Sequence, residues 1–241
     1  MSETTNDLGQ PVGFAVPDWH RADRPSRLPL VGHFCRLEPL TVARHAADLF
    51  AANNADSEGR MWTYLPYGPF PDLAAYQTWV DSMSGRDDPF FYAILDRATG
   101  KAAGVASYLR IDPVNGAIEV GHIAYAPALQ RTPAASEAMY LLMRQVFSLG
   151  YRRYEWKCDA LNGPSRRAAQ RLGFSYEGIF RQAAIYKGRN RDTAWYAMIE
   201  QEWPALQSAF EQWLDPANFD TQGQQRLCLS DLTGPILKQR G

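Results

Sequence analysis

The residues best suited to chemistry lie in one segment, 117–149, where a strand, a loop and a helix follow one another. Glu119 lies between apolar neighbours in the expected strand, and a half-buried carboxylate has a raised pKa that suits a base at neutral pH. Strand alternation places Glu119 on the same face as Ile123, and the alternative base, His122, on the opposite face. The structural alternative for Glu119 is a carboxylate that is paired with an arginine. The structural alternative for His122 is a histidine whose hydrogen bonds are satisfied within the sheet.

The loop after this strand leads into a helix start that suits an anion. Thr132 is a good N-cap, and Pro133 fits the first helical position, where its missing N–H costs the helix least. Small residues follow at 134–136, so a phosphate group can approach the free amides at the positive end of the helix. An ordinary capped helix start remains the structural alternative.

The elements around this segment indicate one mixed α/β domain, because strands and helices alternate along the chain. Residues 1–30 read as an N-terminal arm with the aromatic anchors Phe14 and Trp19, residues 31–214 as the domain, and residues 215–241 as a tail packing on it. We expect strands over 34–40, 90–95, 102–111, 117–125, 151–159, 174–186 and 193–200, and helices over 41–54, 72–83, 133–149, 163–172 and 202–214.

Composition excludes several classes of protein. The 241 residues carry 25 Lys and Arg against 26 Asp and Glu, and this balance argues against a nucleic-acid binder. The three cysteines and four histidines are scattered, which predicts reduced thiols and no metal site. The sequence has no apolar run of membrane-spanning length, and its first residues are polar and acidic. We therefore expect a cytoplasmic protein without a membrane partner.

The run Gln130-Arg131-Thr132-Pro133-Ala134-Ala135 resembles the acetyl-CoA loop of GNAT N-acetyltransferases, Q/R-x-x-G-x-G/A, with Pro133 in place of the usual glycine. Further matches, in order, resemble the RimJ/RimL branch: Glu119-Val120-Gly121, Ser136-Glu137-Ala138, Asn162, Ser165, Leu172-Gly173-Phe174, Glu177-Gly178 and Arg181. The resemblance covers roughly residues 30–215. It implies the α+β GNAT fold, a mixed and largely antiparallel central sheet of about seven strands flanked by helices.

The resemblance also implies an activity, the transfer of an acetyl group from acetyl-CoA to a primary amine by direct attack in a ternary complex, without a metal. The amine belongs to a protein N-terminus or a small molecule. Glu119 then acts as the base, and Ser165 protonates the leaving thiolate of CoA. The implied CoA contacts are the backbone of Ile123, Ala124 and Tyr125, where the family splays the strand from its neighbour, the loop residues Gln130, Arg131, Thr132, Ala134 and Ala135, and the side chains of Asn162 and Ser165.

An aromatic loop is the candidate acceptor site, and the family uses this region over the acceptor. Its residues are Trp62, Tyr64, Tyr67 and Phe70, and aromatic faces can hold an ammonium group, although a core segment fits the sequence equally. The alternative function is an acyl-CoA-binding regulatory protein that keeps the fold without catalysis, which Pro133 motivates. The arm and the tail also leave room for a homodimer contact.

Overall fold

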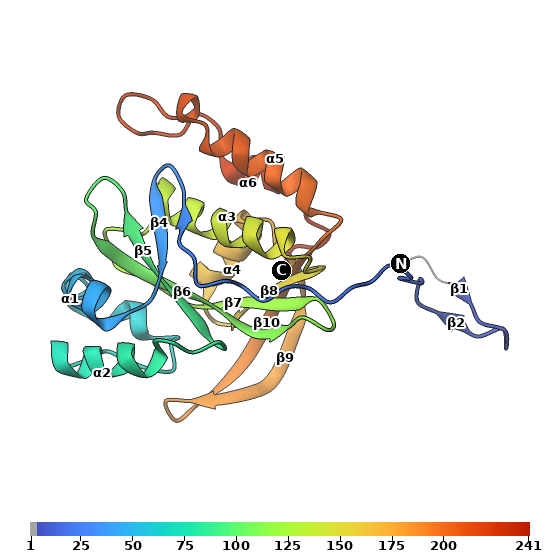
Figure 1. Ribbon diagram of the computed structural model, residues 1–241, viewed down its shortest axis with the longest axis horizontal. Coiled ribbons are helices and arrows are strands. Elements are labelled where there is room, and N and C mark those ends of the chain that lie inside the picture. The colour runs from blue at the N-terminus through green and yellow to red at the C-terminus, as the bar shows by residue number, and fades with distance from the viewer. Residues whose placement is uncertain (1–3) are drawn as a thin grey trace.

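The computed structural model describes residues 4–241, which build one eight-stranded sheet in the order β3-β4-β5-β6-β7-β8-β10-β9 (Figure 1). Every neighbouring pair in this sheet is antiparallel except β7 and β8, which are parallel. The strands are β3 (Leu30–Val31), β4 (Cys35–Pro39), β5 (Phe90–Asp96), β6 (Ala102–Asp112), β7 (Ala117–Tyr125), β8 (Arg153–Asp159), β9 (Ser175–Tyr186) and β10 (Arg189–Ile199).

Helices cover both faces of the sheet (Figure 1). One face carries α1 (Val42–Asn53) and α2 (Leu73–Met83), which bury a smaller core against β5 and β6. The other face carries α3 (Pro133–Ser148), α4 (Gly163–Arg171), α5 (Trp203–Leu214) and α6 (Leu229–Thr233) over the main core. Apolar side chains therefore face both ways along a strand such as β5, where Phe91 joins the smaller core and Tyr92 the main one.

The mixed, largely antiparallel sheet flanked by helices is confirmed, with eight strands rather than about seven. The additional strand, β3, is only two residues long and pairs with β4 at Leu30 and Leu37. Strand β10 begins at Arg189, four residues before the expected start, because the hairpin pairing with β9 runs to Tyr186 and Arg189. No helix of the described residues is long and apolar enough to cross a membrane.

The two ends of the chain contact the body in different ways. In the arm, β1 (Thr4–Thr5) and β2 (Pro11–Val12) form a small hairpin that projects from the body (Figure 1). The arm is held at Trp19, whose Nε1 donates to the carbonyl of Val114 at 2.9 Å. At the other end, Leu229 is buried in the main core.

Candidate functional site

The centre of the candidate site is the point where β7 and β8 part. The two strands pair from Ala117 opposite Arg153 to Val120 opposite Trp156, where their ladder ends. Strand β7 continues along β6 to Tyr125, and β8 continues along β10 to Asp159. The facing backbone edges beyond Val120 thus suit an extended ligand that pairs as a strand does.

A β-bulge in β7 changes the direction in which its side chains point. Ser107 of β6 lies opposite Gly121, whereas Val105 lies opposite Ala124, so β7 has one extra residue at this point. His122 takes a left-handed backbone conformation there, with φ of 51°, which is uncommon for a residue with a side chain.

Because of this bulge, the side chain of His122 does not point to the face that strand alternation predicts. Before it, Ile118 and Val120 face the main core, whereas after it Ile123 and Tyr125 face that core. The side chains of Glu119, His122 and Ala124 therefore share the opposite face, so Glu119 lies with His122 and not with Ile123. Simple alternation fails because the bulge adds a residue.

His122 is held in an aromatic environment. Its ring stacks on Tyr67 with centroids 5.7 Å apart and lies 5.1 Å from the ring of Phe91. Burial is the main cause that lowers the pKa of His122 to about 4, and the nearby Arg110 and Arg191 guanidinium groups add to it. The imidazole is therefore uncharged at neutral pH.

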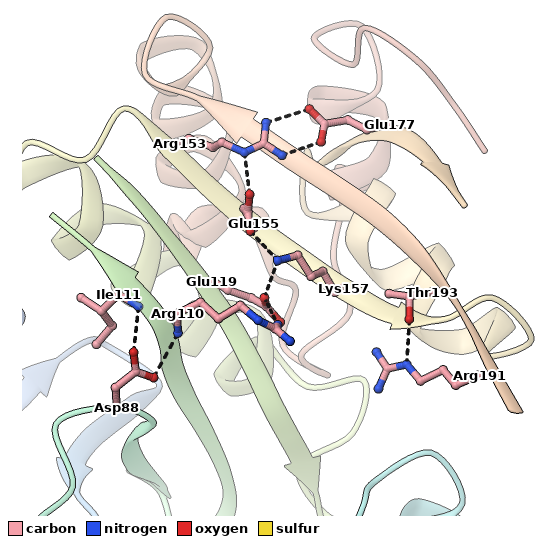
Figure 2. A network of polar contacts seen from close by, with 10 residues as sticks. All are labelled: Asp88, Arg110, Ile111, Glu119, Arg153, Glu155, Lys157, Glu177, Arg191 and Thr193. Carbon is pink, nitrogen blue, oxygen red and sulfur yellow. Dashed lines mark hydrogen bonds and ion pairs between the residues drawn. The ribbon is translucent and has the colours of Figure 1, made fainter. Parts of the chain in front are cut away.

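Glu119 is buried and engaged by two cations (Figure 2). Its Oε2 accepts from Arg110 Nη1 at 2.5 Å and lies 2.9 Å from Lys157 Nζ. Lys157 also reaches Glu155 at 2.7 Å, and Arg153 continues the chain of ion pairs from Glu155. The ion-paired alternative for Glu119 is thus present, while the role of base stays a prediction.

The helix start expected to bind phosphate has the predicted local structure. Helix α3 begins at Pro133, and Thr132 caps it by accepting the amide of Ala135 at 3.2 Å. Arg131 adopts a left-handed conformation with φ of 61°, and Gln130 Nε2 donates to the carbonyl of Tyr125 at 2.8 Å. The cap uses the Ala135 amide, so Arg131, Thr132 and Ala134 supply the better candidate donors for phosphate.

Asn162 and Ser165 lie together at the start of α4. Asn162 caps this helix, with its Oδ1 accepting the Ser165 amide at 3.1 Å. The Ser165 Oγ accepts from Trp156 Nε1 at 3.0 Å. Because the indole N–H is the donor in that bond, the serine hydroxyl keeps its own proton for another acceptor.

The aromatic loop divides between the core and the site. Trp62 is buried, and the ring centroid of Phe70 lies 5.1 Å from that of Tyr76 in α2. Trp62 and Phe70 therefore both contribute to the smaller core. Tyr67 stacks on His122, and Tyr64 donates its hydroxyl to the carbonyl of Leu161 at 3.2 Å, next to α4. The structure therefore brings Tyr64 and Tyr67, rather than all four aromatics, to the candidate site.

Three cationic residues near the site were not indicated by the sequence. Arg110 and Lys157 contact Glu119, and Arg191 lies on β10 near His122. They are distant from one another in the chain, and only the pairing of β6, β7, β8 and β10 brings them together. Within residues 4–241, no group of three or more His, Cys, Asp or Glu side chains is placed to hold a metal ion.

Comparison with known proteins agrees with this geometry. The family described as "Acetyltransferase (GNAT) domain" matches residues 35–175. A crystal structure of a GCN5-related N-acetyltransferase from Brucella melitensis is 47% identical, with 91% of this chain and 100% of that chain covered and a TM-score of 0.89. An uncharacterized N-acetyltransferase, p20, from Bacillus licheniformis is 27% identical over 61% of this chain and 84% of its own length.

A more distant likeness extends to the branch suggested by the sequence. RimL, a ribosomal L7/L12 α-N-protein acetyltransferase, shares the fold at 23% identity, with 75% of this chain and 99% of that chain covered and a TM-score of 0.62. The family match spans more than half of the chain, and the Brucella relative covers nearly all of it. The chain belongs to the GNAT family of acetyltransferases.

Proposed function

We propose that this protein transfers the acetyl group of acetyl-CoA to a primary amine of a protein N-terminus or a small molecule, by direct attack within a ternary complex. The observation that carries the proposal is the parting of β7 and β8 after Val120 and Trp156, close in sequence to the capped start of α3. An extended pantetheine arm suits the open edges, and a pyrophosphate suits the helix start.

The CoA contacts follow from this placement. The backbone of Ile123, Ala124 and Tyr125 pairs with the pantetheine arm, and one of these amides stabilises the oxyanion that forms on the acetyl carbonyl. The amides of Arg131, Thr132 and Ala134 hold the pyrophosphate, because the Ala135 amide already donates to the cap of α3. The carboxamide of Asn162 supplies a further hydrogen bond through its amide nitrogen, because its Oδ1 already serves the cap of α4.

The amine must lose a proton to attack. We assign its removal to Glu119, because an incoming cation can reach its carboxylate beside the exposed Arg110, whereas the imidazole of His122 is stacked among aromatic rings. Arg110 contacts the same Oε2, and its side chain is 62% exposed. The incoming ammonium group therefore takes the place of Arg110 beside Glu119, while the buried Lys157 stays in position.

The chemical step then forms one bond and breaks another. The neutral amine attacks the acetyl carbon, the carbon–sulfur bond breaks, and the thiolate of CoA receives a proton from the Ser165 hydroxyl. The attacking nitrogen then gives up its second proton, which replaces the one that Ser165 has donated. Ser165 therefore ends unchanged, Glu119 holds only the proton of the former ammonium group, and the products are an amide and the free thiol of CoA. Tyr64 and Tyr67 border the acceptor on the side of the aromatic loop.

The activity is tested by adding acetyl-CoA and a panel of primary amines and measuring free thiol. Release that depends on the amine supports acetyl transfer, whereas acetyl-CoA binding without release for any amine favours the regulatory alternative. Glu119→Gln should lower kcat at least about tenfold and leave acetyl-CoA affinity unchanged, because a carboxamide cannot accept the proton. Glu200→Gln, on an exposed side chain, is the matched control.

A further inference from the structure

One guanidinium near the candidate site is fixed in place without an acidic partner. Arg191 is partly buried on β10, and its Nε donates to Thr193 Oγ1 at 3.2 Å. Within residues 4–241, no Asp or Glu oxygen lies within 4.0 Å of its side-chain nitrogens. The hydrogen bond through Nε orients the planar group and leaves both terminal nitrogens as donors.

The neighbouring cations differ from Arg191 because they already have partners. Arg110 contacts Glu119, and Lys157 contacts both Glu119 and Glu155. Lys187, at the turn of the β9–β10 hairpin, donates to the carbonyl of Trp62 at 2.7 Å. A further negative charge at this end of the sheet would therefore find Arg191 as its available partner.

Arg191 also lies where an acceptor would enter. Strand β10 pairs with β8 as far as Thr193 opposite Asp159, so Arg191 extends beyond the end of β8. Its guanidinium carbon is 5.9 Å from the ring centroid of Tyr186. In the view of Figure 2 its guanidinium points from β10 toward the side of the sheet that carries β7 and Glu119.

We propose that Arg191 binds a carboxylate located close to the reacting amine, so that the enzyme selects acceptors with a negative charge beside that amine. This proposal rests on the proposed acetyl transfer and adds the class of acceptor. A carboxylate matches the two remaining donors, since guanidinium binds carboxylate through paired hydrogen bonds. The carboxylate belongs either to a free α-amino acid or to an acidic residue near a peptide N-terminus.

The test compares acceptors that are matched in size and differ in this charge. The first pair is alanine and alaninamide, and the second is the amidated peptides Ala-Asp-Ala-Tyr and Ala-Asn-Ala-Tyr, each with a free N-terminus. For the pair that represents the true source, the charged acceptor should have a kcat/KM at least about tenfold higher, as expected for hydrogen bonds to a charged group. The pair that shows the preference identifies the source of the carboxylate.

Variants of Arg191 test whether this residue causes the preference for the charged acceptor. Arg191→Gln should raise KM for the charged acceptor without changing acetyl-CoA affinity. The kcat/KM values of the charged and uncharged acceptors should then lie within about threefold of each other. Arg191→Lys should restore only part of the preference, because a lysine lacks the paired donors. Arg189→Gln is the control, since Arg189 is an exposed residue on the same strand.

A binding measurement tests the same preference without relying on turnover. In the presence of CoA, N-acetylalanine should bind more tightly than N-acetylalaninamide if the source is an amino acid, and N-acetylated Ala-Asp-Ala-Tyr more tightly than its Asn analogue if it is a peptide. Turnover without a charge preference in either pair, equal binding within both pairs, or a preference that survives Arg191→Gln would overturn this inference. Failure of every amine to release thiol would instead contradict the proposed acetyl transfer.

Discussion

Replacing Lys157 by methionine removes the cation at the centre of the ion-pair network. The side chain of Lys157 is 6% exposed, and its Nζ lies 2.9 Å from Glu119, 2.7 Å from Glu155 and 3.7 Å from the ring centroid of Trp195. Burial raises the pKa of Glu155, but hydrogen bonds from Lys157 and Arg153 outweigh burial and lower it overall. Lys157 thus stabilises the buried charge of Glu119 and the partly buried charge of Glu155 at once.

The expected loss of stability follows from what remains after the substitution. Breaking a buried ion pair costs about 3–5 kcal/mol when a charge is left without a partner. Here Glu119 keeps Arg110 and Glu155 keeps Arg153, and methionine fills the volume beside Trp195. We therefore expect Lys157→Met to lower the free energy of unfolding by about 2–3 kcal/mol.

The assay is urea-induced unfolding near pH 7, with Lys101→Met, at an exposed position, as the control. A double-mutant cycle with Glu119→Gln separates the pair from other effects. The double variant should be more stable than the sum of the single losses predicts, by about 1 kcal/mol or more. Additive losses, or a loss below about 0.5 kcal/mol for Lys157→Met, would refute the assigned network.

Three further outcomes follow from other contacts. Glu137→Gln should destabilise the fold by about 3 kcal/mol or more in urea unfolding, because the buried carboxylate accepts the amides of residues 33, 34 and 35 at 2.6–2.7 Å. For His122, the folded protein binds fewer protons than the unfolded chain between pH of about 4 and 6.5, so stability falls as pH drops through this window. His122→Asn, which tolerates positive φ, should reduce the loss between pH 7 and pH 4.5 by about 2.5 kcal/mol in unfolding measured at both values. Arg131→Glu should weaken acetyl-CoA binding at least about tenfold in calorimetry, because it adds a negative charge at the phosphate loop, whereas Arg189→Glu should leave it unchanged.

Local signals predicted much of the fold and the start of α3. Thr132 and Pro133 have the residue types of an N-cap and a first helical position, and the structure begins α3 there. The helix expected over 72–83 likewise forms as α2, with Asp72 as its cap, which accepts the amide of Ala75 at 2.8 Å. Such features depend on neighbouring residues, so a sequence without any alignment is enough to identify them.

Long-range features of the site could not be predicted in the same way. The bulge at His122 depends on how β7 pairs with β6, and the one local signal for it was Gly121, since a glycine inside a strand is typical of a bulge. The partners of Glu119 come from β6 and β8, nine and 38 positions away in the chain, so only the sheet order brings Arg110 and Lys157 to it. Helix α6 escaped prediction because five residues are too few to show a helical period.

The central claim is that the parted edges of β7 and β8 hold acetyl-CoA. A crystal structure of the protein with bound CoA tests it most directly. We predict that the pantetheine arm pairs with the backbone of residues 123–125 and that the pyrophosphate lies at the amides of Arg131, Thr132 and Ala134. A pantetheine arm bound elsewhere, with the edges of β7 and β8 unoccupied, would contradict the account.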